Sequence, residues 1–143
     1  MTRVIAYAET SAVLAWLLHE ESAAPVRRTL SRAERVVSST LTGVECARAL
    51  MCGIATGRLE QIHHLAALKL LDTAFASWVT LEMTGRILDR ARARFPEEPV
   101  RALDALHLAT ALMFHEAHGS LTMVSLDDRI RANAAALGLA VAP

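Results

Sequence analysis

The chain has 143 residues, of which 53% are hydrophobic, and its 15 basic residues balance its 15 acidic residues. The length predicts one domain over residues 1–143 with a substantial core, while the zero net charge argues against nucleic-acid binding through a large basic surface, though not through a local or metal-borne charge. No apolar run reaches the roughly 18 residues of a membrane span and no secretion signal is visible, so we expect a cytoplasmic protein that does not enter a membrane.

The first predicted elements are a strand and a helix joined by an acid. Residues 4–7 (VIAY) form a short apolar run typical of a strand buried on both faces. Glu9 follows, then Thr10 and Ser11, which suit a helix N-cap, and residues 12–18 are apolar helix formers. Ligands of parallel sheets bind beyond the carboxyl ends of strands, so Glu9 is a candidate site residue, although a turn acid or helix cap is its commoner role.

Strands and helices alternate along the rest of the chain. Further strands are predicted at residues 35–39, 77–83, 122–126 and 139–142, and helices at residues 22–32, 40–57, 58–76, 85–95, 101–118 and 129–137. This alternation predicts an α/β fold, a three-layer α/β/α sandwich with a mostly parallel central sheet. Some of the predicted connections between strands contain two helices.

The cysteines and the adjacent histidines do not indicate a metal site. Cys46 and Cys52 lie six residues apart, on nearly opposite faces of one predicted helix. We therefore expect two buried, unpaired thiols rather than a disulfide or a zinc site. His63 and His64 are neighbours on another predicted helix, and we expect both at the surface.

Four acids share one place in the predicted fold. Glu9 and Asp127 stand just beyond predicted strands, Glu45 lies about 9 Å up a helix that follows another strand, and Asp104 opens the most apolar helix. Carboxylates gathered at one sheet edge repel one another unless a divalent cation neutralises them. Hard oxygen ligands suit Mg²⁺ or Mn²⁺, which can generate hydroxide and stabilise the charge that develops on a phosphate.

Two of these acids also have an ordinary structural interpretation. Glu45 falls three residues after Thr42 and before an apolar run, which is the pattern of a capping box. Asp104 in a first helical turn can simply compensate the helix dipole. On a largely buried helix Asp104 nevertheless needs a partner, and the one local candidate is His107, which is equally suited to support a metal ligand.

The sequence resembles the PIN domain family, specifically the single-domain VapC-type toxins of toxin–antitoxin pairs. The resemblance covers essentially the whole chain and rests on the segments YAETSAVLAWLLHE, TLTGVECARAL, RALDALHLATAL and VSLDDRI. It implies that the family's four acidic positions, which are catalytic and bind the metal, are Glu9, Glu45, Asp104 and Asp127. It also implies a supporting role for the hydroxyl residues Thr10 and Ser11. Asp128 is a further supporting candidate, although an exposed helix N-terminal acid is its commoner role.

The resemblance implies a Mg²⁺- or Mn²⁺-dependent endoribonuclease, usually a homodimer, that is inhibited by a cognate antitoxin. The family most often has Asp at the first acidic position, and Glu9 carries its carboxylate on one more methylene. Two alternatives stay open. One is a PIN-like domain that has lost catalysis and acts only as a binding partner, with Glu9 as its sole support. The other is a metal-dependent phosphatase or phosphotransfer domain, for which Glu9 is a poor nucleophile.

The early predicted helices are more apolar than one small core readily hides. Exposed apolar patches mark interfaces, so we expect these helices to contribute to self-association and to antitoxin binding. The residues that carry this expectation are Val13, Trp16, Leu17, Leu18, Leu50, Met51 and Ile54.

Overall fold

The computed structural model describes residues 3–143. Its strands are β1 (Ile5–Ala8), β2 (Arg35–Ser39), β3 (Val79–Leu81), β4 (Thr122–Val124) and β5 (Ala140–Ala142). Its helices are α1 (Thr10–Leu17), α2 (Ala23–Arg32), α3 (Thr40–Ala55), α4 (Gln61–Ser77), α5 (Gly85–Arg92), α6 (Ala102–His118) and α7 (Asp128–Ala136). Each of the first three connections between strands contains two helices, as predicted, and the last contains one.

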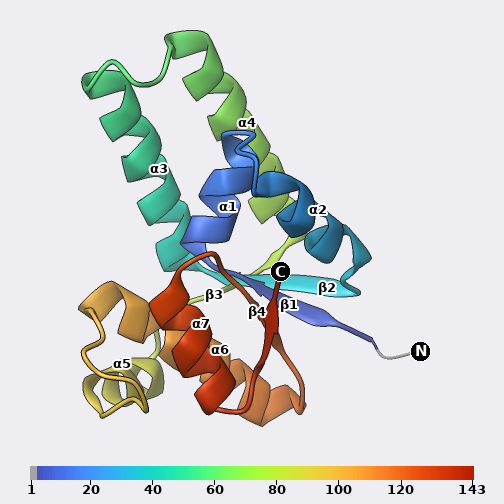
Figure 1. Ribbon diagram of the computed structural model, residues 1–143, viewed down its shortest axis with the longest axis vertical. Helices are drawn as coiled ribbons and strands as arrows, with labels where there is room; N and C mark the ends of the chain where they lie inside the picture. The colour runs from blue at the N-terminus through green and yellow to red at the C-terminus, as the bar shows by residue number, and fades with distance from the viewer. Residues whose placement is uncertain (1–2) are drawn as a thin grey trace.

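The strands form one sheet in the order β3-β2-β1-β4-β5, and each neighbouring pair is parallel. Helices α1 to α4 cover one face of the sheet and α5 to α7 cover the other (Figure 1). The predicted three-layer sandwich with a mostly parallel sheet is therefore confirmed. The chain extends the sheet from β1 first to one side and then to the other, so the topological switch point lies between β1 and β4.

Strand β1 is central because its side chains fit between the two helical layers. Ala6 and Ala8 point to the layer of α1 to α4, where their small size lets these helices approach the sheet closely. Tyr7 points the other way and packs in the core beneath α6 and α7 with Leu108 and Ile130. All three β1 side chains are fully buried. Among residues 3–143, none of the helices has the length and apolar character needed to cross a membrane.

Two helix starts differ from prediction in the residue that caps them. Glu9, not Thr10 or Ser11, is the N-cap of α1, because its carboxylate accepts a hydrogen bond from the Ser11 backbone and Thr10 is already helical. Ser39 caps α3 in the same way, accepting from the Leu41 backbone at 3.1 Å. The capping-box interpretation of Glu45 is therefore wrong, since α3 begins two residues before Thr42.

The predicted burial is confirmed for one cysteine and one histidine and is wrong for the other two residues. Both cysteines are unpaired, but only Cys46 is buried and Cys52 is exposed. Cys52 lies in the last turn of α3. Helices α3 and α4 extend together beyond the sheet (Figure 1). His63 is exposed as predicted, whereas His64 is buried because it falls on the same helical stripe as Ala67.

The apolar residues expected at an interface divide between core and surface. Val13, Leu17 and Leu50 are buried within the protein, so the expectation that they form an exposed patch is wrong. Leu18 and Met51 are exposed, at 38% and 46%. Further exposed apolar side chains of this layer are Val44 of α3 and Ile62 and Leu65 of α4.

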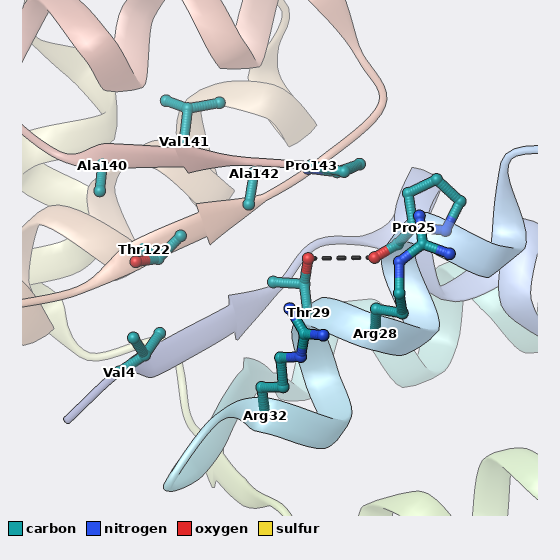
Figure 2. A pocket seen from close by; sticks show the side chains of 10 residues that line it. All are labelled: Val4, Pro25, Arg28, Thr29, Arg32, Thr122, Ala140, Val141, Ala142 and Pro143. Carbon is teal, nitrogen blue, oxygen red and sulfur yellow. Dashed lines mark hydrogen bonds between the residues drawn. The ribbon is translucent and has the colours of Figure 1, made fainter. Parts of the chain in front are cut away.

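A pocket of about 500 Å³ opens between α2 and the strands β4 and β5 (Figure 2). Arg28 and Arg32 of α2 line it, with Thr29 between them donating to the Pro25 carbonyl at 3.0 Å. Its lining contains none of the four predicted site acids.

Asn133 of α7 anchors the loop that leads into α6. Its side chain is fully buried. Its Oδ1 accepts from the Glu97 backbone N–H at 2.8 Å, and its Nδ2 donates to the Glu97 carbonyl at 3.1 Å and to the Arg129 carbonyl at 3.0 Å. This anchor fixes where α6 begins, and hence where Asp104 in its first turn is held.

Replacing Asn133 with alanine removes these hydrogen bonds and leaves a buried polar gap. We expect the free energy of unfolding to fall by about 1–3 kcal/mol, measured by urea denaturation. Ala135→Ser on the exposed face of the same helix is the control and should change it by no more than about 0.5 kcal/mol. Equal stability of Asn133→Ala and the control would contradict this assignment.

Candidate active site

The carboxyl ends of β1 and β4 meet at the topological switch point. The two strands pair as far as Ala8 and Val124, and the next residue, Glu9, donates its backbone N–H to the Val124 carbonyl at 3.0 Å. Helix α1 leaves β1 here, and the turn from β4 to α7 begins here. Ligands of parallel α/β sheets bind at such a point.

Glu9 is only 4% exposed, and both of its carboxylate oxygens accept hydrogen bonds from neutral donors. Oε2 accepts from the Ser11 backbone N–H at 3.0 Å, and Oε1 accepts from the Ser11 hydroxyl at 2.5 Å and from the Ser125 hydroxyl at 2.6 Å. The two serines are held in turn, because Leu126 N–H donates to Ser11 at 2.9 Å and Asp127 N–H donates to Ser125 at 3.1 Å. Glu9 therefore caps α1 and joins the end of β1 to the turn that follows β4.

Glu45 of α3 reaches the same edge and is held by a different pair of donors. Its Oε1 accepts from the Thr10 hydroxyl at 2.7 Å and from His107 Nε2 at 2.5 Å. Burial opposes ionisation of Glu45, but the hydrogen bonds from His107 and Thr10 outweigh burial and lower the pKa of its carboxyl group. Glu45 is therefore ionised at neutral pH.

His107 does not form the hydrogen bond to Asp104 that is one of its two predicted roles. Its Nε2 lies against Glu45 and its Nδ1 lies 2.8 Å from the hydroxyl of Tyr7. The reason is helical geometry: Asp104 lies one turn earlier on α6, at the sheet edge, whereas His107 points inward and is 1% exposed.

Asp104 is half-buried and has no hydrogen-bond partner among residues 3–143. Burial raises the pKa of its carboxyl group, and the carboxylates of Asp127 and Glu9 raise it further, against smaller opposing effects of His107 and Arg101. Repulsion between acids from α6, β4–α7 and β1–α1 means that these three carboxylates lie close enough to interact. The site carries negative charge that its own residues do not balance.

Asp127 and Asp128 separate into a site residue and a surface residue. Asp127 caps α7, and its Oδ1 accepts from the Ile130 backbone N–H at 2.9 Å. Asp128 is exposed in the first turn of α7 and, within residues 3–143, forms no hydrogen bond to the other candidate residues. Its position is that of an ordinary N-terminal helix acid.

Sequence reasoning misses Ser125 as a member of the site. Its side chain is fully buried and contacts Glu9 directly. A polar residue at the carboxyl end of a buried strand, two residues before a candidate acid, is the signal that identifies it. Tyr7 is missed for a different reason, since its place in an apolar strand run hides that its hydroxyl reaches His107.

The donor types at this edge fit a divalent cation such as Mg²⁺ or Mn²⁺. Both ions prefer carboxylate, hydroxyl and water oxygens. A cation would also relieve the repulsion that raises the pKa of Asp104. In the described part of the chain, no three His, Cys, Asp or Glu side chains stand close enough together to hold an ion. An ion bound at this edge therefore requires the carboxylates to turn toward it.

Comparisons with known proteins extend over nearly the whole chain. A sequence model of the PIN domain family matches residues 6–136, which include all four acids. No curated protein sequence matches the chain. The fold is similar to that of PAE2754 from Pyrobaculum aerophilum, with a TM-score of 0.63 and 21% identity over 97% of this chain and 83% of that one. It is also similar to VapC20 (Rv2549c) of Mycobacterium tuberculosis, a sarcin-ricin loop cleaving toxin, with a TM-score of 0.68 and 18% identity over 97% and 99%.

The raised pKa of Asp104 predicts that its charge destabilises the fold when no divalent ion is present. Asp104→Asn should therefore raise the free energy of unfolding at pH 7.5 in a chelator, by less than about 1 kcal/mol because solvent screens a half-exposed group. The gain should disappear as the pH falls below the ordinary Asp value of 3.8, where the parent carboxyl group is neutral in both folded and unfolded chains.

The matched control for this measurement is Asp128→Asn, which removes an exposed acid from a helix N-terminus. It should lower stability at pH 7.5 by about 0.3–1 kcal/mol. Urea denaturation of the three proteins at pH 3.5 and 7.5 makes the comparison, and an Asp104→Asn protein less stable than the parent at pH 7.5 would refute the interpretation.

Proposed function

Because the chain belongs to the PIN domain family, we propose that it is a metal-dependent endoribonuclease toxin of the VapC type that a cognate antitoxin inhibits. The observation that carries the proposal is that Glu9, Asp127 and Asp104 meet near the switch point, where burial first, and then the charges of Asp127 and Glu9, raise the pKa of Asp104. Acids that converge without a balancing charge destabilise a fold. A bound divalent cation would neutralise them, so an acidic cluster of this kind suits a metal-dependent function.

The proposed metal-binding and catalytic residues are Glu9, Glu45, Asp104 and Asp127. A bound Mg²⁺ or Mn²⁺ supplies a Lewis acid and lowers the pKa of a coordinated water, which suits hydrolysis of a phosphodiester. Ser11 and Ser125 hold the Glu9 carboxylate, and Thr10 holds the Glu45 carboxylate, so the hydroxyl residues orient ligands. Asp128 has no part in the proposed site.

Asp104 has the freest of the four carboxylates. The other three each accept at least one hydrogen bond, whereas Asp104 accepts none among residues 3–143. It can turn toward an ion without breaking an existing interaction. Asp104 is therefore the position where substitution tests the chemistry with least disturbance of the fold.

RNA is the proposed substrate class. The likeness to VapC20, a sarcin-ricin loop cleaving toxin, supports this at the level of a shared fold. The zero net charge of the chain is compatible with it if the positive charge that meets the RNA phosphate comes from the bound ion. Cleavage of cellular RNA implies action in the cytoplasm.

The proposed partners are a second copy of the chain and a small antitoxin protein. An interface on this layer is supported by exposed apolar side chains on and beside the α3–α4 hairpin. These side chains are Leu18, Met51, Ile62 and Leu65. An arginine from an antitoxin tail is suited to pair with the carboxylates at the switch point and so to block them.

Asp104→Asn should lower the rate of RNA cleavage in Mg²⁺ or Mn²⁺ by at least about 100-fold, because it removes an ion ligand. Asp128→Asn is the control and should cleave at the parental rate. Gel analysis of one RNA with all three proteins in each metal, with folding checked by circular dichroism, decides the outcome. Cleavage by Asp104→Asn at the parental rate would rule out the proposed site, and an inactive parent would favour the binding-only alternative.

Glu9 is expected to remain a working ligand, with a different metal preference from that of an aspartate. Its extra methylene displaces the ion or the rotamer, and Mg²⁺ tolerates displacement less than Mn²⁺ because it demands near-ideal octahedral geometry. We expect more activity in Mn²⁺ than in Mg²⁺, a smaller difference in Glu9→Asp, and near-complete loss in Glu9→Gln. Full activity of Glu9→Gln would mean that Glu9 only caps α1.

A further inference from the structure

A buried chain of hydrogen bonds runs from Tyr7 through His107 to Glu45. The Tyr7 hydroxyl lies 2.8 Å from His107 Nδ1, and His107 Nε2 lies 2.5 Å from Glu45 Oε1. Tyr7 is fully buried and His107 is 1% exposed, whereas the Glu45 side chain keeps 22% of its surface exposed. This series of hydrogen bonds thus begins in the core beneath α6 and ends at the open edge of the site.

The partners determine where the hydrogens lie. The Glu45 carboxylate can only accept, so His107 Nε2 carries a hydrogen and donates it. The Tyr7 hydroxyl lies 2.8 Å from Nδ1, and in a neutral His107 whose hydrogen is on Nε2 it donates to Nδ1. The tyrosine therefore fixes the histidine tautomer that carries its hydrogen on Nε2.

This arrangement occupies one oxygen of Glu45 and leaves the other open. Oε1 accepts from both His107 and Thr10, while no group within residues 3–143 donates to Oε2. A glutamate side chain that is free to rotate loses rotamer entropy when a ligand fixes it. His107, which is held on its other side by Tyr7, fixes Glu45 before any ligand binds.

We propose that Tyr7 and His107 are positioning residues that hold Glu45 with Oε2 free to bind an ion, and so set both the ion affinity and the maximal rate of the reaction. The inference rests on the proposed function of Glu45 as an ion ligand. In this arrangement Tyr7, a core residue, affects the orientation of Glu45 through His107.

The test is calorimetric titration of Mn²⁺ into the full chain without RNA. His107→Leu should weaken binding by about 10–100-fold, as loss of such a partner typically does. His107→Gln should recover part of the affinity, because its amide N–H can replace the Nε2 donor. Tyr7→Phe, which removes only a hydroxyl, should weaken binding less and in the same direction. With RNA, the kcat of these variants should fall while the KM stays unchanged.

His64→Leu is the matched control, because it removes a buried histidine of α4 whose ring forms no hydrogen bond within residues 3–143. It should bind Mn²⁺ like the parent. A second readout is nuclear magnetic resonance of the His107 ring, which should carry its hydrogen on Nε2. A hydrogen on Nδ1 with a bare Nε2 would overturn the inference.

Glu45→Gln separates this inference from the proposed function. If the parent binds no Mn²⁺, or if Glu45→Gln binds it as tightly as the parent, then Glu45 is not a ligand and the proposed function fails. If Glu45→Gln loses affinity while folded His107→Leu and Tyr7→Phe bind like the parent, the positioning role alone is overturned. A weakened folded Tyr7→Phe supports the role even if His107→Leu does not fold.

Discussion

Repulsion among carboxylates at one edge of a parallel sheet is the constraint on which this structure depends. The topology brings Glu9 and Asp127 to the ends of neighbouring strands, and the protein tolerates their charges by giving each a separate set of neutral donors. Hydroxyl groups and the N-terminus of α1 stabilise the charge of Glu9, and the N-terminus of α7 stabilises the charge of Asp127. Asp104 receives no such support, and burial, followed by the charges of Asp127 and Glu9, raises the pKa of its carboxyl group.

The same residues that reduce the repulsion also build the fold. Glu9 caps α1, and through Ser125 it joins two strands that are more than one hundred residues apart in sequence. The site is therefore not an addition to a finished scaffold, since removing Glu9 weakens a helix start and a strand junction as well as removing a charge. Glu45 differs, because its donors Thr10 and His107 hold a side chain that has no capping role.

The sequence predicts the strands, the helices and the layered fold, because buried strand runs and helical periodicity are local signals. It also predicts that Glu9 and Asp127 reach the sheet edge, since both lie just beyond strands. It does not predict that His107 bonds Glu45, because that contact joins residues 62 positions apart. The burial of His64 and the exposure of Cys52 are missed for a related reason: they depend on which faces of α3 and α4 pack against other helices.

The central claim is that these carboxylates turn toward one divalent ion at the switch point between β1 and β4. The most direct measurement is a crystal structure of the protein grown with Mn²⁺, in which anomalous scattering locates the metal without reference to the protein. The account predicts a peak at this edge, coordinated by Asp104 and by at least two of Glu9, Glu45 and Asp127. A structure with no peak there at saturating Mn²⁺, or with Mn²⁺ bound only elsewhere, would contradict it.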